Sequence, residues 1–196
     1  VVSFFNPTLE LKGKKVLITA GPTYEAIDPV RFIGNHSSGK MGYALAEVAL
    51  KMGAAVTLIS GPSSEKISYP SLKLIKVVSA EEMLTAVQEF YDSTDIAIAA
   101  AAVADFKPKK IASNKLKKES GLAHISLVPT VDILSYMGEK KKKQKLIGFA
   151  LETENELEHA KGKLSRKNLD GIVLNSLQDP DAGFSVTTNK ITFIHS

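Results

Sequence analysis

The chain has 196 residues, of which 44% are hydrophobic and 23% charged, so it is long enough to bury one sizeable core. Its net charge of +4 is too small for a dense basic nucleic-acid surface, and its lack of cysteine excludes disulfides, thiolate nucleophiles and cysteine-ligated metals. The four histidines show no metal-ligand spacing, and no apolar run reaches the roughly 20 residues that span a bilayer. These properties predict a cytoplasmic protein that binds neither nucleic acid nor a membrane.

Apolar strands and amphipathic helices alternate along the chain. The first strand, Val16 to Ala20, is a continuous apolar run, as in a strand buried on both faces. A polar, glycine-punctuated loop follows it and leads into a helix from Met41 to Met52, which Gly53 ends. The alternation continues with strands near 55–59, 72–78, 95–104, 145–150, 171–175 and 190–195 and helices near 79–91, 131–140 and 154–167. It predicts an α/β fold class, a Rossmann-like, doubly wound, mostly parallel sheet with helices on both faces.

The domain organisation predicted from this pattern is simple. Residues 13–196 are expected to form a single α/β domain, preceded by a linker at 1–12. The chain opens at Val1 without Met, which predicts a fragment of a longer polypeptide.

The loop from Asn35 to Gly42 is the most informative stretch. A helix start offers unpaired backbone N–H groups and the positive end of the helix dipole, and Lys40 adds a cation, so this loop is placed to receive phosphate. Its glycines are expected to let an anion approach the backbone. From Gly34 it satisfies G-x4-G-K, but Met41 stands where a P-loop needs Ser or Thr, and its glycines do not form G-x-G-x-x-G. A P-loop and a dinucleotide fingerprint are therefore both disfavoured.

A second polar loop, residues 105–118, carries six lysines. Two interpretations stay open for any one of them, a solvated surface charge or a phosphate contact. Four polar loops, at 21–42, 105–118, 152–155 and 175–183, follow strand carboxyl ends, so we expect all four to converge on one crevice.

Five segments together resemble one known family, phosphopantothenoylcysteine synthetase, the ligase of coenzyme A biosynthesis. The resemblance runs in order from about residue 11 to 194. The segments that carry it are Ile18-Thr19-Ala20-Gly21-Pro22-Thr23, Ile27-Asp28-Pro29-Val30-Arg31, Asn35-His36-Ser37-Ser38-Gly39-Lys40-Met41-Gly42, Ala101-Ala102-Val103-Ala104-Asp105-Phe106 and Gly148-Phe149-Ala150-Leu151-Glu152-Thr153.

The resemblance implies an acid–amine ligation. In it, 4′-phosphopantothenate reacts with CTP to give an acyl-cytidylate and pyrophosphate, and L-cysteine then displaces CMP. Mg²⁺ is implied as the partner of the triphosphate, with unknown protein ligands, and ATP in place of CTP is not excluded by the residues. The resemblance also implies a homodimer and fusion to, or association with, a flavin-dependent decarboxylase domain, as in a multifunctional enzyme.

The resemblance further implies roles for individual residues. Asn35 would contact the acyl-nucleotide and Lys115 would support activation, with Lys117 and Lys118 as rivals; a helix N-cap is the alternative for Asn35. The implied nucleotide-binding residues are Ala101, Asp105, Lys115, Asp132, Ile133, Phe149, Lys163 and Lys167, and the implied substrate-binding residues are Asn35, Ser37, Ser38, Gly39 and Lys40.

Two other functions compete with the ligase. An NAD(P)-dependent Rossmann-fold reductase would share the sheet but needs the missing glycine fingerprint. A non-catalytic nucleotide-binding module would keep the crevice without the chemistry expected of Lys115.

Overall fold

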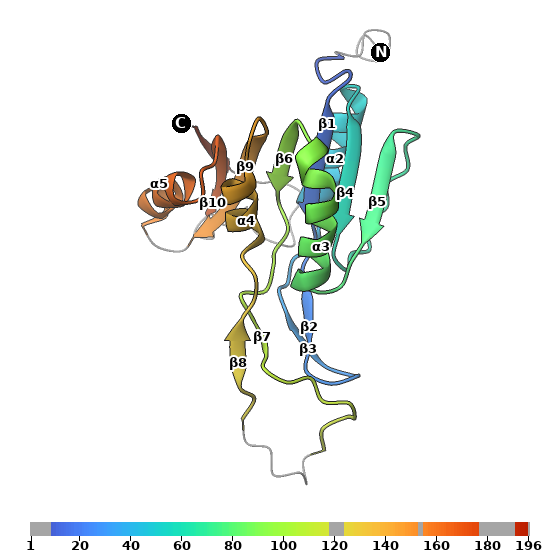
Figure 1. Cartoon of the computed structure of the whole chain (residues 1–196), viewed down its shortest axis with the longest axis vertical. Coiled ribbons are helices and arrows are strands. Elements are labelled where there is room, and N and C mark those ends of the chain that lie inside the picture. The colour runs from blue at the N-terminus through green and yellow to red at the C-terminus, as the bar shows by residue number, and fades with distance from the viewer. Residues whose placement is uncertain (1–8, 118–123, 153–154, 177–190, 196) are drawn as a thin grey trace.

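A seven-stranded sheet forms the centre of the fold (Figure 1). The computed structural model describes residues 9–117, 124–152, 155–176 and 191–195, and the structural statements below concern these ranges. The strands lie in the order β11-β10-β9-β6-β1-β4-β5, all parallel to their neighbours except β11, which runs antiparallel to β10. Their bounds are β1 (Lys15–Ala20), β4 (Ala55–Ser60), β5 (Leu72–Lys76), β6 (Ile96–Ala99), β9 (Lys145–Glu152), β10 (Gly171–Ser176) and β11 (Ile191–His195).

The order of the strands confirms the predicted doubly wound fold. From β1 the chain first builds outward through β4 and β5, then crosses back and builds outward on the other side through β6, β9 and β10. The switch in direction therefore lies between β1 and β6. In such sheets a ligand site is expected outside the strand carboxyl ends at this point.

Four helices cover the two faces of the sheet. They are α2 (Lys40–Lys51), α3 (Ala80–Phe90), which continues into the short η1 (Tyr91–Ser93), α4 (Ile133–Lys140) and α5 (Glu156–Arg166). Alternate residues of β1 face opposite sides: Ile18 packs in one buried cluster with Ala46 of α2, and Leu17 in another with Met83 of α3 and residues of α4 and α5. Figure 1 shows α3 and α4 in front of the sheet and α2 behind it. The predicted helices on both faces are thus present.

Two short antiparallel ribbons were not predicted. One pairs β2 (Tyr24–Ala26) with β3 (Phe32–Gly34), and the other pairs β7 (Phe106–Pro108) with β8 (Leu127–Pro129). We call the described residues 24–34, 106–117 and 124–129 the arm. In Figure 1 the arm projects beyond the carboxyl edge of the sheet. Strands of three residues are too short to produce the alternation by which a strand is recognised in a sequence.

Both ends of the described chain lie at the opposite, amino edge of the sheet. Near the first end, the backbone N–H of Leu11 donates to the carbonyl of Met52, where the chain turns towards β4. At the other end, His195 pairs with Gly171, the first residue of β10. In Figure 1 the amino end of β1 lies on the side away from the arm.

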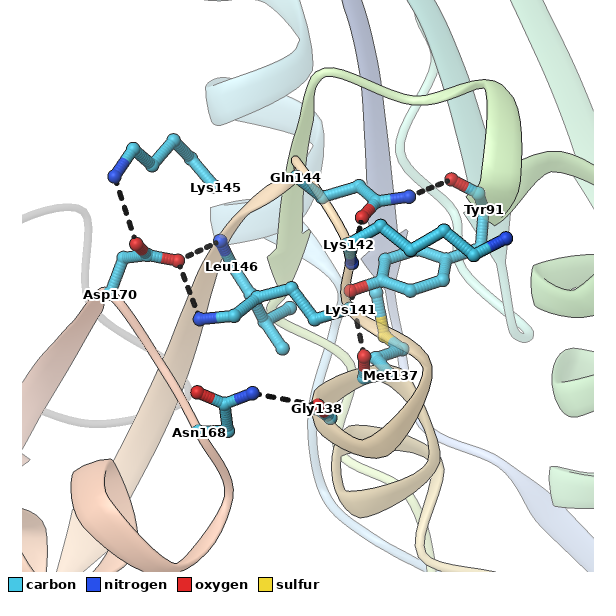
Figure 2. A network of polar contacts seen from close by, with 10 residues as sticks. All are labelled: Tyr91, Met137, Gly138, Lys141, Lys142, Gln144, Lys145, Leu146, Asn168 and Asp170. Carbon is cyan, nitrogen blue, oxygen red and sulfur yellow. Dashed lines mark hydrogen bonds and ion pairs between the residues drawn. The ribbon is translucent and has the colours of Figure 1, made fainter.

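A polar network joins several elements at this amino edge (Figure 2). The Asp170 carboxylate accepts hydrogen bonds from the Leu146 N–H at 2.9 Å and from the ammonium groups of Lys141 and Lys145, each at 3.0 Å. The buried Tyr91 hydroxyl donates to the Met137 carbonyl at 2.8 Å, which ties η1 to α4. The network therefore fixes the start of β9 against the ends of α3 and α4.

Candidate functional site

The loops after β1 and β6 lie side by side at the switch point. Pro22 and Ala102 form a parallel bridge, and the backbone N–H of Ala102 donates to the Gly21 carbonyl at 2.9 Å. The Thr23 N–H returns a hydrogen bond to the Ala102 carbonyl at 3.2 Å. The segments that directly follow β1 and β6 therefore meet here, as expected for the carboxyl ends of neighbouring parallel strands.

Asn35 connects the loop before α2 to this pair. Its side-chain amide donates to the carbonyls of Ala102, at 2.9 Å, and Val103, at 3.3 Å. The structure thus brings Asn35 and the predicted Ala101 segment together. The alternative role of Asn35 as a helix cap is wrong, because the N-cap residue of α2 is Gly39.

Serine hydroxyls cover the first backbone donors of α2. Ser37 accepts from the Gly39 N–H at 3.3 Å, and Ser38 accepts from the Lys40 N–H at 3.4 Å. These bonds are long, so a stronger acceptor such as a phosphate oxygen could replace them at a small free-energy cost. Lys40 is exposed beside them, and the first turn of α2 contains no acidic residue.

The glycines of this loop have a different role from the predicted one. Gly39 adopts a left-handed conformation with φ 85°, which non-glycine residues rarely adopt. At Gly42 an added Cβ would lie only 2.4 Å from the Cβ of Ala20. Gly42 therefore allows α2 to pack closely on β1; the expectation that it opens the backbone to an anion is wrong.

Two buried threonines of the site were missed in the sequence. The Thr19 hydroxyl accepts from the Ala101 N–H at 3.3 Å, and the Thr23 hydroxyl accepts from the Ala104 N–H at 2.9 Å. Both side chains are almost fully buried and hold the loop after β6 in place. Their position at the carboxyl end of β1 is the signal that could have identified them.

A second group of predicted residues connects α5 with the start of α4 and with β9. The Lys167 ammonium forms an ion pair with Asp132, at 2.7 Å and 3.0 Å to its two oxygens, and the Lys163 ammonium donates to the Phe149 carbonyl at 2.9 Å. Burial raises the pKa of Asp132, but Lys167 and the Ser135 N–H lower the pKa by more than burial raises it. The pKa of Asp132 therefore lies below its usual value. Both predicted triphosphate lysines therefore already have protein partners.

The remaining predicted residues of this region differ in accessibility. Ile133 begins α4 and is buried in the core, while Phe149 is half-buried. Asp105 is exposed, and its carbonyl accepts from the Thr130 N–H at 2.9 Å, which joins the segment before α4 to the loop after β6.

Lys115 lies on the arm, apart from the switch point. It lines a pocket of about 1350 Å³ together with Ile27 and the segments 109–117 and 124–126. Strand β3 lies between Lys115 and Asn35. Leu116, the residue after Lys115, contacts Arg31 before β3, and the four residues from Arg31 to Asn35 span about 13 Å when extended. The predicted single crevice therefore divides into two regions, and most of the other two loops expected in it, 152–155 and 175–183, lies outside the described residues. Of the two alternatives to Lys115, Lys117 also lines the pocket, whereas Lys118 lies outside the described residues.

Within the described ranges, no group of three or more His, Cys, Asp or Glu side chains could hold a metal ion. In the same ranges, no helix has the length and hydrophobicity that crossing a membrane requires.

Comparisons with known proteins place the chain among proteins of coenzyme A metabolism. The family DFP, described as the DNA/pantothenate metabolism flavoprotein C-terminal domain, matches residues 11–196. The coenzyme A biosynthesis bifunctional protein CoaBC of Bacillus subtilis is 53% identical over 93% of this chain and 45% of its own length. A cysteine/cysteine sulfinic acid decarboxylase of an unknown prokaryotic organism is 53% identical over 99% of this chain and 55% of its own length.

A solved structure agrees with these relatives. The crystal structure of the C-terminal domain of a CoaBC protein has 47% sequence identity and a TM-score of 0.78, with 94% of this chain and 83% of that chain covered. The present chain spans about half the length of the curated relatives it matches. The Bacillus subtilis relative is named a bifunctional protein, which agrees with the predicted fusion of such a domain to a second one.

These findings contradict the predicted identification as a phosphopantothenoylcysteine synthetase. The matched family is named for a flavoprotein and a similar relative is named as a decarboxylase, and these names contain neither a ligase nor CTP or magnesium. The predicted CTP-dependent ligation, its CTP and Mg²⁺, and the reductase and nucleotide-module alternatives are therefore not retained. The two lysines assigned to a triphosphate also have partners within the protein, Asp132 and the Phe149 carbonyl.

The family model matches nearly the whole chain, and a relative of the chain is named for coenzyme A biosynthesis. The chain belongs to the DFP family of DNA/pantothenate metabolism flavoprotein C-terminal domains.

Proposed function

We propose that this domain binds 4′-phosphopantothenoylcysteine for a bifunctional protein of coenzyme A biosynthesis, which decarboxylates the cysteinyl end of that compound. The names of the relatives support the pathway and the decarboxylation. The chain covers only part of those relatives, so the decarboxylation is assigned to the full-length protein and the binding to this domain.

The lining of the arm pocket is the observation that carries the proposal. Four of its residues are lysines, at positions 109, 110, 115 and 117, and it also presents Ile27, Ile111 and Ile125. The ligand has the same two properties, a phosphate dianion and an apolar pantoyl group. Ammonium groups attract the phosphate, and burial of the pantoyl methyl groups adds the hydrophobic contribution.

The switch point supplies polar groups for the other end of the ligand. They are the Asn35 amide, the serine hydroxyls and Lys40. Arg31 contacts Leu116 beside the arm pocket, and the four residues from Arg31 to Asn35 span about 13 Å when extended, a length that an extended ligand can bridge. In this proposal Lys115 binds the phosphate, and the Oδ1 of Asn35, whose Nδ2 donates to backbone carbonyls, accepts from the amide N–H of the cysteinyl end.

The flavin implied by the family name does not fit either of two pockets formed by the described residues. An isoalloxazine ring is usually held between apolar or aromatic side chains. The arm pocket contains lysines around its isoleucines, and a second pocket, at the start of α5, is lined by Asn155, Glu156, Leu157, Glu158 and Lys161. We therefore derive no step of this domain through flavin.

Isothermal titration of the domain with 4′-phosphopantothenoylcysteine tests the proposal. Replacing Lys115 with Gln should raise Kd about tenfold, because one charge-assisted contact is lost. Lys142→Gln is the matched control, since this exposed lysine pairs with Asp92 at the opposite edge of the sheet and should leave Kd unchanged. Absence of binding to the unsubstituted domain, or equal effects of the two variants, would show that the arm pocket is not the phosphate site.

A homodimer is the second part of the proposal. Six apolar side chains of the arm are between 42% and 61% exposed. They are Val30, Phe32, Phe106, Ile111, Ile125 and Leu127. A surface of this kind marks an association site, and a second copy of the chain would cover it.

Sedimentation velocity tests the dimer. The domain should sediment as a dimer, and Val30→Glu should convert it to a monomer because a charge would be buried without a partner. Leu157→Glu, on the exposed side of α5 and equally apolar before substitution, should leave the dimer intact. A monomeric parent domain at micromolar concentration would refute the homodimer.

A further inference from the structure

The two halves of the arm are joined at one buried carboxylate. The side chain of Asp28 has no exposed surface, although it lies in the turn between β2 and β3. It accepts five hydrogen bonds: its Oδ1 from the N–H groups of Val30 at 2.8 Å and Arg31 at 2.9 Å, and its Oδ2 from Arg31 Nε at 3.0 Å, Arg31 Nη2 at 2.5 Å and the Leu116 N–H at 3.1 Å. A buried charge of this kind is stabilised only when its oxygens are fully hydrogen-bonded, as they are here.

Leu116 is held at both of its backbone polar groups. Its N–H donates to Asp28, and its carbonyl accepts from Arg31 Nη2 at 2.8 Å. A further bond joins the same two segments, from the Ala112 N–H to the Ile27 carbonyl at 2.9 Å. Asp28 and Arg31 thus hold Leu116, the residue that directly follows Lys115, by hydrogen bonds.

The segment held by these hydrogen bonds carries several positive charges. Residues 109, 110, 115 and 117 are all lysines, and like charges so close along a chain repel one another and favour an open, variable loop. The Arg31 guanidinium beside Asp28 holds the pKa of that carboxyl well below its usual range. The Asp28 carboxylate therefore stays charged throughout the neutral range of pH.

We propose that Asp28 and Arg31 are positioning residues that lock the 112–117 segment onto the β2–β3 turn and thereby set where Lys115 meets the ligand phosphate. The ligand part of this inference rests on the proposed function above. The lock itself does not, because it concerns only the order of the segment. The two are therefore tested by separate measurements.

The absence of cysteine allows a direct measurement of the order of the segment. A spin label on Ser113→Cys reports on the segment, and a label on Gln88→Cys, on the exposed side of α3, reports on the rest of the fold. In Asp28→Asn the rotational correlation time at position 113 should become about threefold shorter, because the charge-assisted bonds to Arg31 are lost. The label at position 88 should not change.

Two further variants separate the lock from a general loss of structure. Arg31→Lys keeps the charge but loses the two-nitrogen contact that Nε and Nη2 make with Asp28, so it should also free the label at position 113. Asp92→Asn removes an exposed carboxylate remote from the arm and should leave both labels unchanged. An equally immobile label at position 113 in Asp28→Asn and Arg31→Lys would refute the lock.

A double-mutant cycle tests whether the lock acts through Lys115. Asp28→Asn should raise Kd for 4′-phosphopantothenoylcysteine about tenfold in the parent domain and leave it almost unchanged in the Lys115→Gln background. Equal effects in both backgrounds would overturn the positioning role and leave a purely structural lock. Failure of the parent domain to bind would overturn the proposed function and the ligand role of Asp28, and the labels would still decide the lock.

Discussion

Replacing Asn35 with Asp should weaken binding of 4′-phosphopantothenoylcysteine about 10- to 100-fold, since a lost hydrogen bond to a buried or charged group costs roughly 1–3 kcal/mol. The amide of Asn35 donates to the carbonyls of Ala102 and Val103. A carboxylate has no proton to donate, so at neutral pH it would face two carbonyl oxygens and repel both them and an anionic ligand. Titration calorimetry at neutral pH measures the change in Kd.

Asn168→Asp is the matched control for this prediction. The Asn168 amide also donates to a backbone carbonyl, that of Gly138 at 3.0 Å, but it lies in the network at the amino edge of the sheet (Figure 2). The same chemical change there should lower thermal stability and leave Kd unchanged. If Asn35→Asp also bound the ligand as tightly as the parent, Asn35 would only join two loops. Asn35→Ala, which loses the bonds without adding charge, should show a smaller effect than Asn35→Asp.

Replacing Asp170 with Asn should lower the free energy of unfolding at neutral pH by about 2 kcal/mol, the amount expected from its pKa shift. Burial raises the pKa of Asp170, but the Leu146 N–H and the ammonium groups of Lys145 and Lys141 together lower the pKa by more than burial raises it. The pKa therefore falls from its ordinary 3.8 to about 2. A carboxyl whose pKa is lower in the folded state stabilises the fold above its unfolded pKa. This contribution is lost as pH falls from about 4 to about 2.

Urea unfolding followed by circular dichroism at several pH values checks this result. The difference between the parent and Asp170→Asn should be constant above pH ~5 and shrink as the pH falls towards 2. Asp92→Asn is the control, because Asp92 and Lys142 are 71% and 70% exposed and an exposed pair contributes at most about 1 kcal/mol. A difference that persists unchanged at the lowest pH would mean that the charge of Asp170 does not stabilise the fold.

The sheet and its helices could be predicted because each element is specified by its own residues. Val16 to Ala20 is apolar throughout, as a strand covered on both faces must be, and β1 occupies that stretch in the centre of the sheet. The arm could not be predicted in the same way. Its strands have three residues each, and the contact that fixes it joins Asp28 to Leu116, which are 88 positions apart in the sequence.

The candidate site was predicted in part for the same physical reason. Asn35 and Ala101 follow the carboxyl ends of neighbouring parallel strands, and such ends meet at one edge of a sheet. Lys167 was assigned to a triphosphate from the resemblance, and nothing in the sequence indicates its ion pair with Asp132, 35 positions away. The reaction was predicted from resemblance alone, and the names of the matched family and relatives contradict it.

The placement of both described chain ends at the amino edge of the sheet has a practical consequence. Leu11 and His195 lie on the side of the molecule away from the arm and the switch point. A surface tether or a fluorescent reporter attached through either end would therefore leave the ligand-facing edge open to solution. Immobilised at one end and then at the other, the domain should give the same dissociation constant for a soluble ligand.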